Sequence, residues 1–143
     1  MKETLIPGLT REFSFRVPET KTVAALYPES PEFQQMPRVF ATGFMVGLVE
    51  WVCLQAINPH LDWPKEQTVG TRVNLSHTAA TPPGMQVTVK VTLAEVDGRR
   101  LVFEVSGRDE ADAITEGTHE RYVIDAPRFI QRVEEKGRKA SGG

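Results

Sequence analysis

The chain has 143 residues, of which 40% are hydrophobic and 25% are charged, and its formal net charge is −2. This balance is typical of a single soluble globular domain, here spanning residues 1–143. A small negative charge leaves no electrostatic footprint for nucleic acid, and no segment approaches the roughly 18 uncharged apolar residues that span a membrane. The N-terminus lacks the basic start and apolar core of a signal peptide. We therefore expect a cytoplasmic protein with no nucleic-acid or membrane partner.

The first half of the chain predicts one strand and one long helix. Residues 10–17 alternate between apolar and polar side chains, which is typical of a strand. Residues 20–37 are rich in Pro, Glu and Ser and predict a long surface segment with a short helical turn. Residues 38–57 are apolar on more than one side, so we expect a helix that is buried nearly all round, with Trp51 packed against a sheet.

The second half predicts four successive antiparallel strands. Their alternating runs cover residues 68–78, 84–96, 100–106 and 113–124, with turns at 97–98 and 107–110. Residues 126–136 predict a short amphipathic helix, and we expect the tail from about residue 137 to be disordered. This order favours an α+β fold in which one antiparallel sheet wraps around one long central helix. Dimerisation through the edge strands would cover the open sheet and make clefts between subunits.

Glu50 and His77 are the first candidates for chemistry. Glu50 lies inside the apolar helix, where a carboxylate is costly to desolvate unless it has a partner or a purpose. His77 ends the alternating run of residues 69–78, and an imidazole changes its charge near neutral pH. Together they can perform acid–base or nucleophilic work in a pocket. From these residues alone, a solvent-facing Glu50 and an ordinary strand histidine remain open alternatives.

Four motifs carry a resemblance to a known family, and they occupy residues 26–33, 39–51, 78–84 and 117–121. With the order of the elements, they resemble the hotdog fold and, within it, the fluoroacetyl-CoA thioesterase family of single-domain hydrolases. The resemblance implies an enzyme that hydrolyses a short-chain, fluoroacetyl-CoA-like thioester to an acid and free CoA. It also implies a homodimer with its sites at the interface, and leaves higher assembly open. CoA is part of the substrate, and no separate cofactor is implied.

The same resemblance implies roles for individual residues. Thr42, Glu50 and His77 match the family's catalytic threonine, glutamate and histidine. Gly70 matches a glycine that lines the thioester site, and Arg121 matches an arginine near it. The positions that match an apolar lid over the acyl group are Val23, Leu26, Phe33 and Met36. Relatives that prefer fluoroacetyl groups carry a second lid phenylalanine where this chain has methionine, which is flexible and specifies poorly, so the acyl group stays open.

Several of these residues also have simpler interpretations. Thr42 lies about 12 Å from Glu50 along an ideal helix, so both serve one acyl group only if Thr42 precedes the helix or acts across a dimer. Alternatively, Thr42 is the N-cap of the helix. His119 is expected to be structural and His60 to lie in a loop, and the histidine spacing gives no metal site. Two rival functions remain: a hotdog enoyl-CoA hydratase and a non-catalytic protein that binds or senses acyl-CoA.

Overall fold

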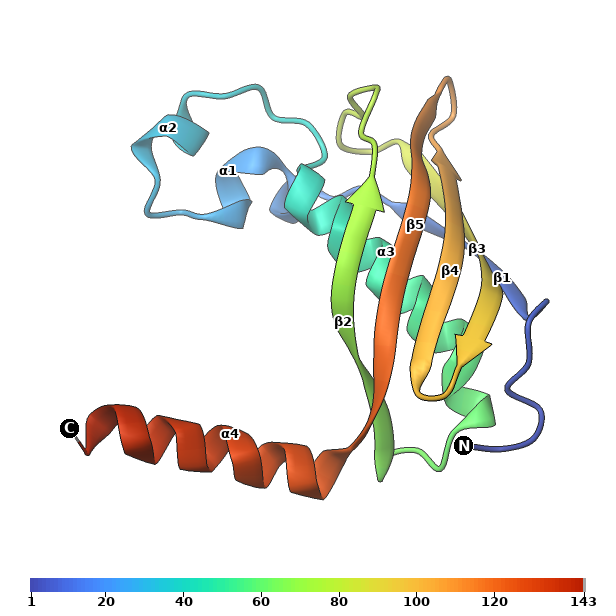
Figure 1. Ribbon diagram of the computed structural model, residues 1–143. Coiled ribbons are helices and arrows are strands. Elements are labelled where there is room, and N and C mark those ends of the chain that lie inside the picture. Colours follow the sequence, from blue (N-terminus) through green and yellow to red (C-terminus); the bar gives the residue numbers. More distant parts are fainter. Residues whose placement is uncertain (143) are drawn as a thin grey trace.

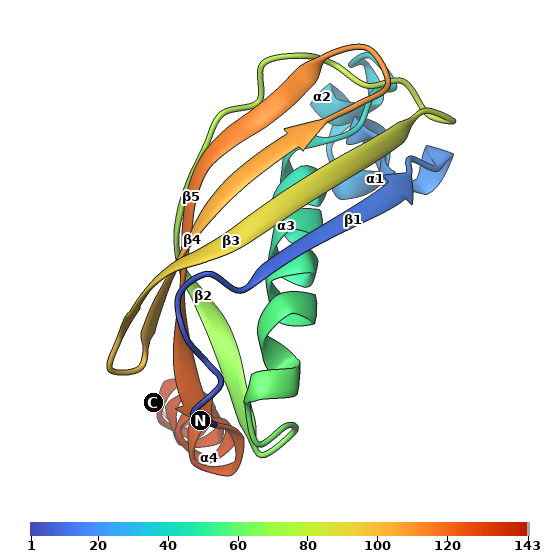
Figure 2. The same ribbon diagram turned by 90° about the vertical axis from the view of Figure 1, so that its right-hand side faces the viewer.

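The computed structural model describes residues 1–142 and consists of one sheet packed on one long helix (Figure 1). The central helix is α3 (Thr42–Ile57). The strands are β1 (Thr10–Arg16), β2 (Glu66–Leu75), β3 (Gln86–Asp97), β4 (Arg100–Arg108) and β5 (Ala113–Asp125). The sheet curves around α3 in a single layer (Figure 2). The expected α+β architecture, an antiparallel sheet wrapped around one long helix, is confirmed.

The strand order differs from the order along the chain. The sheet runs β1-β3-β4-β5-β2, and every pair is antiparallel. β2 therefore pairs with β5 and not with β3, which follows it in sequence. As a result β2 lies at a free edge of the sheet, and its residue Gly70 lies directly opposite Arg121 of β5.

The core forms between the inner face of the sheet and one face of α3. The buried helix residues recur at the spacing of one helical face, and they are Met45, Leu48, Val49, Val52, Cys53, Ala56 and Ile57. The opposite side of α3 is also apolar but is not covered in the single chain. Trp51 was expected in the core, yet it is 48% exposed, and its ring meets Phe13 edge-on at a centroid distance of 4.9 Å. α3 is therefore apolar all round, but the rest of the chain covers only part of its surface.

The long segment between β1 and α3 is more ordered than expected. It contains the 3-10 helix η1 (Glu19–Lys21) and the short helices α1 (Val23–Leu26) and α2 (Pro31–Gln34). The Ser30 hydroxyl accepts from the backbone N–H of Phe33 and so caps α2. Gln34 ties α2 to α1 because its amide donates to the carbonyl of Ala24 at 2.9 Å. We call residues 23–39 the lid segment.

Two element boundaries differ from those expected from the sequence. Residues 38–41 were expected to be helical, but α3 begins at Thr42 and its N-cap is Ala41. The alternative that Thr42 is the N-cap is therefore wrong: Thr42 is the first residue within the helix.

The turn expected at residues 107–110 is displaced, because β4 continues to Arg108. The Asp109 carboxylate then accepts from the N–H groups of Ala111 and Asp112 and forms the turn.

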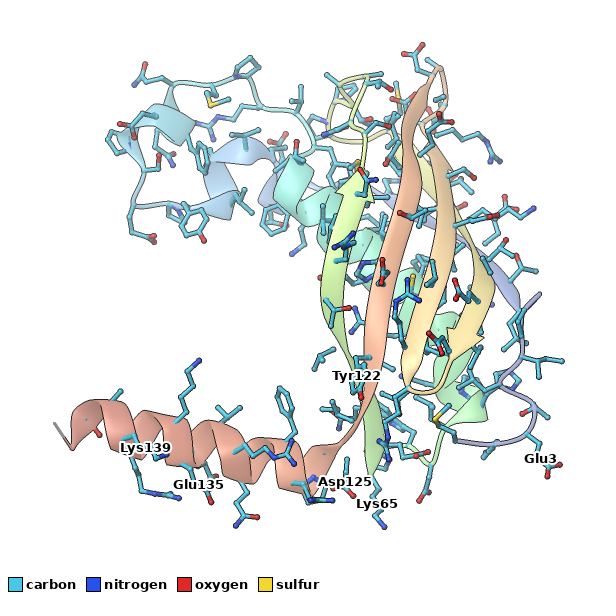
Figure 3. The ribbon with its side chains drawn as sticks, in the orientation of Figure 1. Glu3, Lys65, Tyr122, Asp125, Glu135 and Lys139 are labelled. Carbon is cyan, nitrogen blue, oxygen red and sulfur yellow. The ribbon has the colours of Figure 1, made fainter. Side chains whose placement is uncertain are left out.

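The C-terminal helix is longer than expected. α4 (Ala126–Ser141) includes residues for which the sequence predicted disorder, while residue 143 lies outside the described part. Asp125 stands at the junction of β5 and α4 (Figure 3), and its carboxylate accepts from the N–H of Arg128 as the N-cap. The short 3-10 helix η2 (Asn58–His60) follows α3. Within residues 1–142, no helix has the length and apolar character needed to cross a membrane.

Candidate active site

Glu50 forms an ion pair with Arg121 on the inner side of the sheet. The guanidinium Nη1 donates to the carboxylate Oε2 at 2.8 Å. The two side chains differ in burial, since Arg121 is 5% exposed and Glu50 is 39% exposed. A charge-assisted hydrogen bond to a buried, immobile donor orients a carboxylate far better than a surface pair does. Glu50 is thus held at one oxygen while the rest of the carboxylate remains accessible.

Arg121 is itself held from more than one direction. Its Nε donates to the hydroxyl of Thr68 at 2.8 Å, and its Nη2 donates to the carbonyl of Thr68 at 2.9 Å. Its Nη1 also lies 3.2 Å from Nε2 of His119. The planar fork of donors on arginine makes such contacts directional. The guanidinium therefore has one orientation in which all of these contacts are made.

Gly70 packs closely against this ion pair. A Cβ at this position would stand 2.9 Å from Oε2 of Glu50 and 3.4 Å from Nη1 of Arg121. The ladder between β2 and β5 shifts register between Gly70 and Arg72, which marks a β-bulge. Bulges are common beside active sites, where they redirect neighbouring groups. Gly70, which the family resemblance placed at the site, thus lies beside Glu50.

Thr42 and His77 form a second pair. The hydroxyl Oγ1 of Thr42 lies 2.7 Å from Nδ1 of His77, and the two residues come from the start of α3 and the segment after β2. The other ring nitrogen of His77, Nε2, is buried and has no hydrogen-bond partner among residues 1–142. Burial lowers the pKa of His77 below its usual value of 6.5, so the ring is neutral near pH 7.

The sequence predicted that Glu50 and His77 would meet, and within one chain they belong to different groups. Glu50 pairs with Arg121 and His77 pairs with Thr42, and among residues 1–142 no hydrogen bond joins the two groups. Thr42 and Glu50 also lie in one regular helix, so their separation of about 12 Å along its axis stands. Within the described residues, the expected contact between Glu50 and His77 is therefore not made.

The lid segment packs on the start of α3, close to the Thr42–His77 pair. A Cβ on Gly43 would come within 3.0 Å of Cδ1 of Leu26, so this side chain lies directly over the helix backbone. The ring of Phe33 packs against Tyr27 at a centroid distance of 6.1 Å. Val23 opens α1, and Met36 lies beyond α2 with 45% exposure. All four expected lid residues thus lie on one segment, and Leu26 is the member that contacts α3.

Two other reactive side chains take no part in this arrangement. Cys53 is fully buried, and burial raises the pKa of its thiol to about 12, so it does not supply a thiolate near neutral pH. His60 hydrogen-bonds the hydroxyl of Thr4 through Nδ1 at 2.7 Å. Within the described residues, no group of three or more His, Cys, Asp or Glu side chains is placed to hold a metal ion.

His119 is the residue that the sequence interpretation placed outside the site. It was expected to be purely structural, yet its ring lies next to Arg121, which holds Glu50. The available signal was spacing, because residues 119 and 121 of one strand point to the same face of a sheet.

An antiparallel sheet around one helix, with a carboxylate and a histidine near its free edge, defines a hotdog-fold protein. The same fold occurs in a hot-dog-like protein from Thermanaerovibrio acidaminovorans, with a TM-score of 0.76 at 22% identity over 91% of both chains.

The comparisons also identify the family. The model of the fluoroacetyl-CoA-specific thioesterase family, FlK, matches residues 17–127. A fluoroacetyl-CoA thioesterase from Streptantibioticus cattleyicolor is 52% identical over 136 residues, which cover 95% of this chain and 97% of the relative. A point mutant of the fluoroacetyl-CoA-specific thioesterase FlK, solved with fluoroacetate and CoA, has a TM-score of 0.85 at 53% identity, covering 87% of this chain and 99% of that one. The chain belongs to the fluoroacetyl-CoA-specific thioesterase family, and it is a thioester hydrolase.

Proposed function

We propose that this single-domain hydrolase cleaves short-chain acyl-CoA thioesters of the fluoroacetyl-CoA type, and that its working unit is a homodimer. In this proposal each site combines Glu50 of one copy with Thr42 and His77 of the other. The observation that carries it is the buried Nε2 of His77, which has no partner within the described part of its own chain. A buried polar atom without a partner points to a group supplied from outside, such as the Glu50 carboxylate of a second copy together with the water that it activates.

Three features of the fold support a second copy beside β2. β2 is an edge strand, whose free backbone groups can pair with another strand. The lid segment and α4 both project beyond β2 on the same side (Figure 1), so a neighbour beside β2 would lie between them. Glu50 is 39% exposed in the single chain, which leaves its carboxylate accessible to the residues of such a neighbour.

The chemistry requires an attacking oxygen and a leaving thiolate. The carboxylate of Glu50 attacks the thioester carbonyl to form an anhydride, which water then hydrolyses, or it activates a water that attacks directly. In both routes a C–O bond forms, the C–S bond breaks, and the electron pair leaves on the sulfur of CoA. His77, which is neutral near pH 7, takes up the proton released by water. The CoA thiolate is a good leaving group, so little acid assistance is needed.

The start of α3 provides donors for the oxyanion that develops on the carbonyl. Ala41 offers no side-chain cap, so the N–H groups of the first helical turn have no side-chain acceptor at the N-cap. These groups carry the positive end of the helix dipole, and they lie next to the Thr42–His77 pair. Donors aimed at a developing negative charge stabilise the transition state.

The acyl group is proposed to lie beneath the lid segment. Leu26 packs over Gly43, one residue from Thr42, and this proximity limits the room above the start of the helix. Such a lid suits an acyl group of a few atoms. The structure of the relative with fluoroacetate and CoA supports a fluorinated two-carbon acyl group among the substrates.

Mixed dimers test the shared site. Glu50→Gln and His77→Ala are each expected to lower turnover by at least ~100-fold, as measured by release of free thiol from a panel of acyl-CoA substrates. Refolding the two variants together forms heterodimers in which one of the two sites is intact. If partners exchange randomly, about a quarter of wild-type activity should return.

The controls define what would refute the proposal. Each variant refolded alone must remain inactive, and both must retain the thermal stability and oligomeric state of the wild type. A mixture that stays inactive would place all of the residues of a site in one chain. Near-normal turnover by Glu50→Gln would remove Glu50 from the reaction.

A further inference from the structure

His119 lies in the network that holds Glu50. Its side chain is on the inner face of β5 and the residue is 1% exposed. Nδ1 is 2.8 Å from the carbonyl oxygen of Arg72, and Nε2 is 3.2 Å from Nη1 of Arg121. The same Nη1 donates to Glu50 at 2.8 Å. A single guanidinium nitrogen thus connects the imidazole to the carboxylate.

The two neighbours of His119 dictate where its proton resides. A carbonyl oxygen only accepts, so Nδ1 must carry a hydrogen and donate to Arg72. A guanidinium only donates, so Nε2 must keep its lone pair and accept from Arg121. The neutral ring with its proton on Nδ1 satisfies both contacts. An imidazolium would place a second N–H against Nη1 of Arg121 and break the contact.

The acceptor for Nδ1 comes from the β-bulge in β2. The register between β2 and β5 shifts between Gly70 and Arg72, and at this point the carbonyl of Arg72 accepts from the imidazole of the neighbouring strand. The bulge therefore does two things. It brings the α-carbon of Gly70 against Glu50, and it supplies the acceptor that fixes the tautomer of His119.

The charges around His119 favour the neutral ring. Its ladder neighbour on β4 is the apolar Phe103. The charged side chains that act on His119 are Glu50 on α3 and Glu120 and Arg121 on β5, while Arg72 on β2 contributes its backbone carbonyl. Burial is the main cause that lowers the pKa of His119, and the positive charge of Arg121 acts in the same direction. The hydrogen bond to Arg72 and the carboxylates of Glu50 and Glu120 oppose this shift without reversing it.

We propose that neutral His119 is a positioning residue for thioester hydrolysis, which acts through Arg121 to hold the Glu50 carboxylate in its reactive orientation. This inference rests on the proposed role of Glu50. It assigns His119 no contact with substrate. Nη1 of Arg121 carries two hydrogens, one directed to Glu50 and one to His119, so losing the second acceptor removes one of the contacts that fix the rigid guanidinium against Glu50.

Two substitutions separate the contacts of the ring. His119→Asn keeps a donor near the position of Nδ1 and removes the acceptor for Arg121. His119→Gln places an amide oxygen near the position of Nε2 and restores that acceptor. We expect the Asn variant to lower kcat about 10-fold with KM changed less than about 2-fold, which is the scale for partners that orient a site residue. The Gln variant should recover most of kcat.

The pH profile gives a readout that a merely structural role would not change. If both His77 and His119 must be neutral, log kcat of the wild type should fall at acid pH with a slope of about two. In His119→Gln the slope should fall to about one, because only His77 still titrates. An unchanged kcat in His119→Asn, or an acid limb in His119→Gln identical to that of the wild type, would overturn the inference.

A spectroscopic measurement tests the tautomer without relying on activity. Long-range 1H–15N spectra of the wild type at pH 7.5 should show His119 protonated at Nδ1. Protonation at Nε2, or a charged ring, would overturn the inference even if both variants fail to fold.

The background variant Glu50→Gln separates this inference from the proposed function. If Glu50→Gln is inactive but His119→Asn is fully active, only the role of His119 fails. If Glu50→Gln is active, the proposed function fails first. When both roles hold, adding His119→Asn to Glu50→Gln should cause no further loss of kcat, whereas a general structural defect would lower it again.

Discussion

Gly70 and Glu50 meet across the gap between β2 and α3 at a distance that is too short for a Cβ unless the carboxylate shifts: a Cβ on Gly70 would lie 2.9 Å from the carboxylate Oε2. The atom that would have to move is the end of a flexible side chain, so the fold can absorb the change. The hydrogen bond from Arg121 cannot follow the displaced carboxylate without moving the buried guanidinium. A side chain at residue 70 should therefore disturb the orientation of the Glu50 carboxylate more than the stability of the fold.

Gly70→Ala should lower kcat by roughly 10- to 100-fold, because a misplacement of about 1 Å in a reacting group can have that effect. The melting temperature should change by only a few degrees. Gly137→Ala is the control, since a Cβ there meets no atom within 4 Å. Equal kcat values for the two variants would show that the fit between Gly70 and Glu50 is unimportant for turnover.

The hydroxyl of Thr42 can be tested with two substitutions of similar size. Thr42→Val removes the oxygen that lies 2.7 Å from Nδ1 of His77, and Thr42→Ser keeps it. Because Thr42 is the first helical residue and Ala41 is the N-cap, neither change removes a helix cap. We expect Val to lower kcat/KM at least ~10-fold and Ser to retain most of it. If the Thr42→Val variant is as active as the Thr42→Ser variant, the hydroxyl takes no part in the reaction.

Activity and stability should both decline below pH 6.5. Burial lowers the pKa of His77 and of His119 from the usual value of 6.5. Activity that needs both rings neutral should therefore be flat near pH 7 and fall at lower pH, with a midpoint below 6.5.

Stability, like activity, should decrease as the pH falls below 6.5. In the unfolded chain both rings take up protons near pH 6.5, while in the native state they resist until lower pH. The free energy of unfolding should therefore fall as the pH drops from 6.5 towards the native pKa values. Urea unfolding between pH 5 and 7.5 measures this, and His77→Gln with His119→Gln should reduce the dependence. If the double variant keeps the full pH dependence of the wild type, groups other than these two histidines cause that dependence.

Met36→Phe should sharpen selectivity among small acyl groups. Met36 is 45% exposed on the lid segment, so a larger ring at this position does not disturb the core. A phenyl ring is stiffer than a methionine side chain and limits the shapes that the lid accepts. We expect the ratio of kcat/KM for fluoroacetyl-CoA over acetyl-CoA to rise about 5- to 10-fold, the scale of one apolar contact in a specificity pocket. An unchanged ratio would place Met36 outside the acyl pocket.

The fold follows from patterns that the sequence displays directly. Alternation along residues 84–96 and 100–106 predicted β3 and β4 closely, because one face of each strand is buried and the other is not. The exposure of Trp51 was missed because an apolar residue is equally compatible with a core and with a surface that awaits a partner. The pairing of β2 with β5 was not evident either, since alternation identifies strands but not their neighbours.

The sequence indicated which residues form the candidate site, but not which of them contact each other. Glu50 stood out as a lone carboxylate in an apolar helix, yet its observed partner is Arg121, which lies 71 residues away in the chain. His119 was assigned to the structure because it alternates with Glu120 on a strand, and its link to Glu50 through Arg121 depends on how β5 packs against α3.

The base of the lid segment is tied on both sides. Thr22 and Phe40 form an isolated bridge, the N–H of Val23 donates to the carbonyl of Val39, and the N–H of Ala41 donates to the carbonyl of Lys21. These bonds close the two ends of residues 23–39 into a hinge directly ahead of α3. We expect the lid segment to move about this base when a thioester enters, which would leave the helix that carries Thr42 intact. Hydrogen exchange should accordingly be slow at the amides of Val23 and Ala41 and fast in the tip between them.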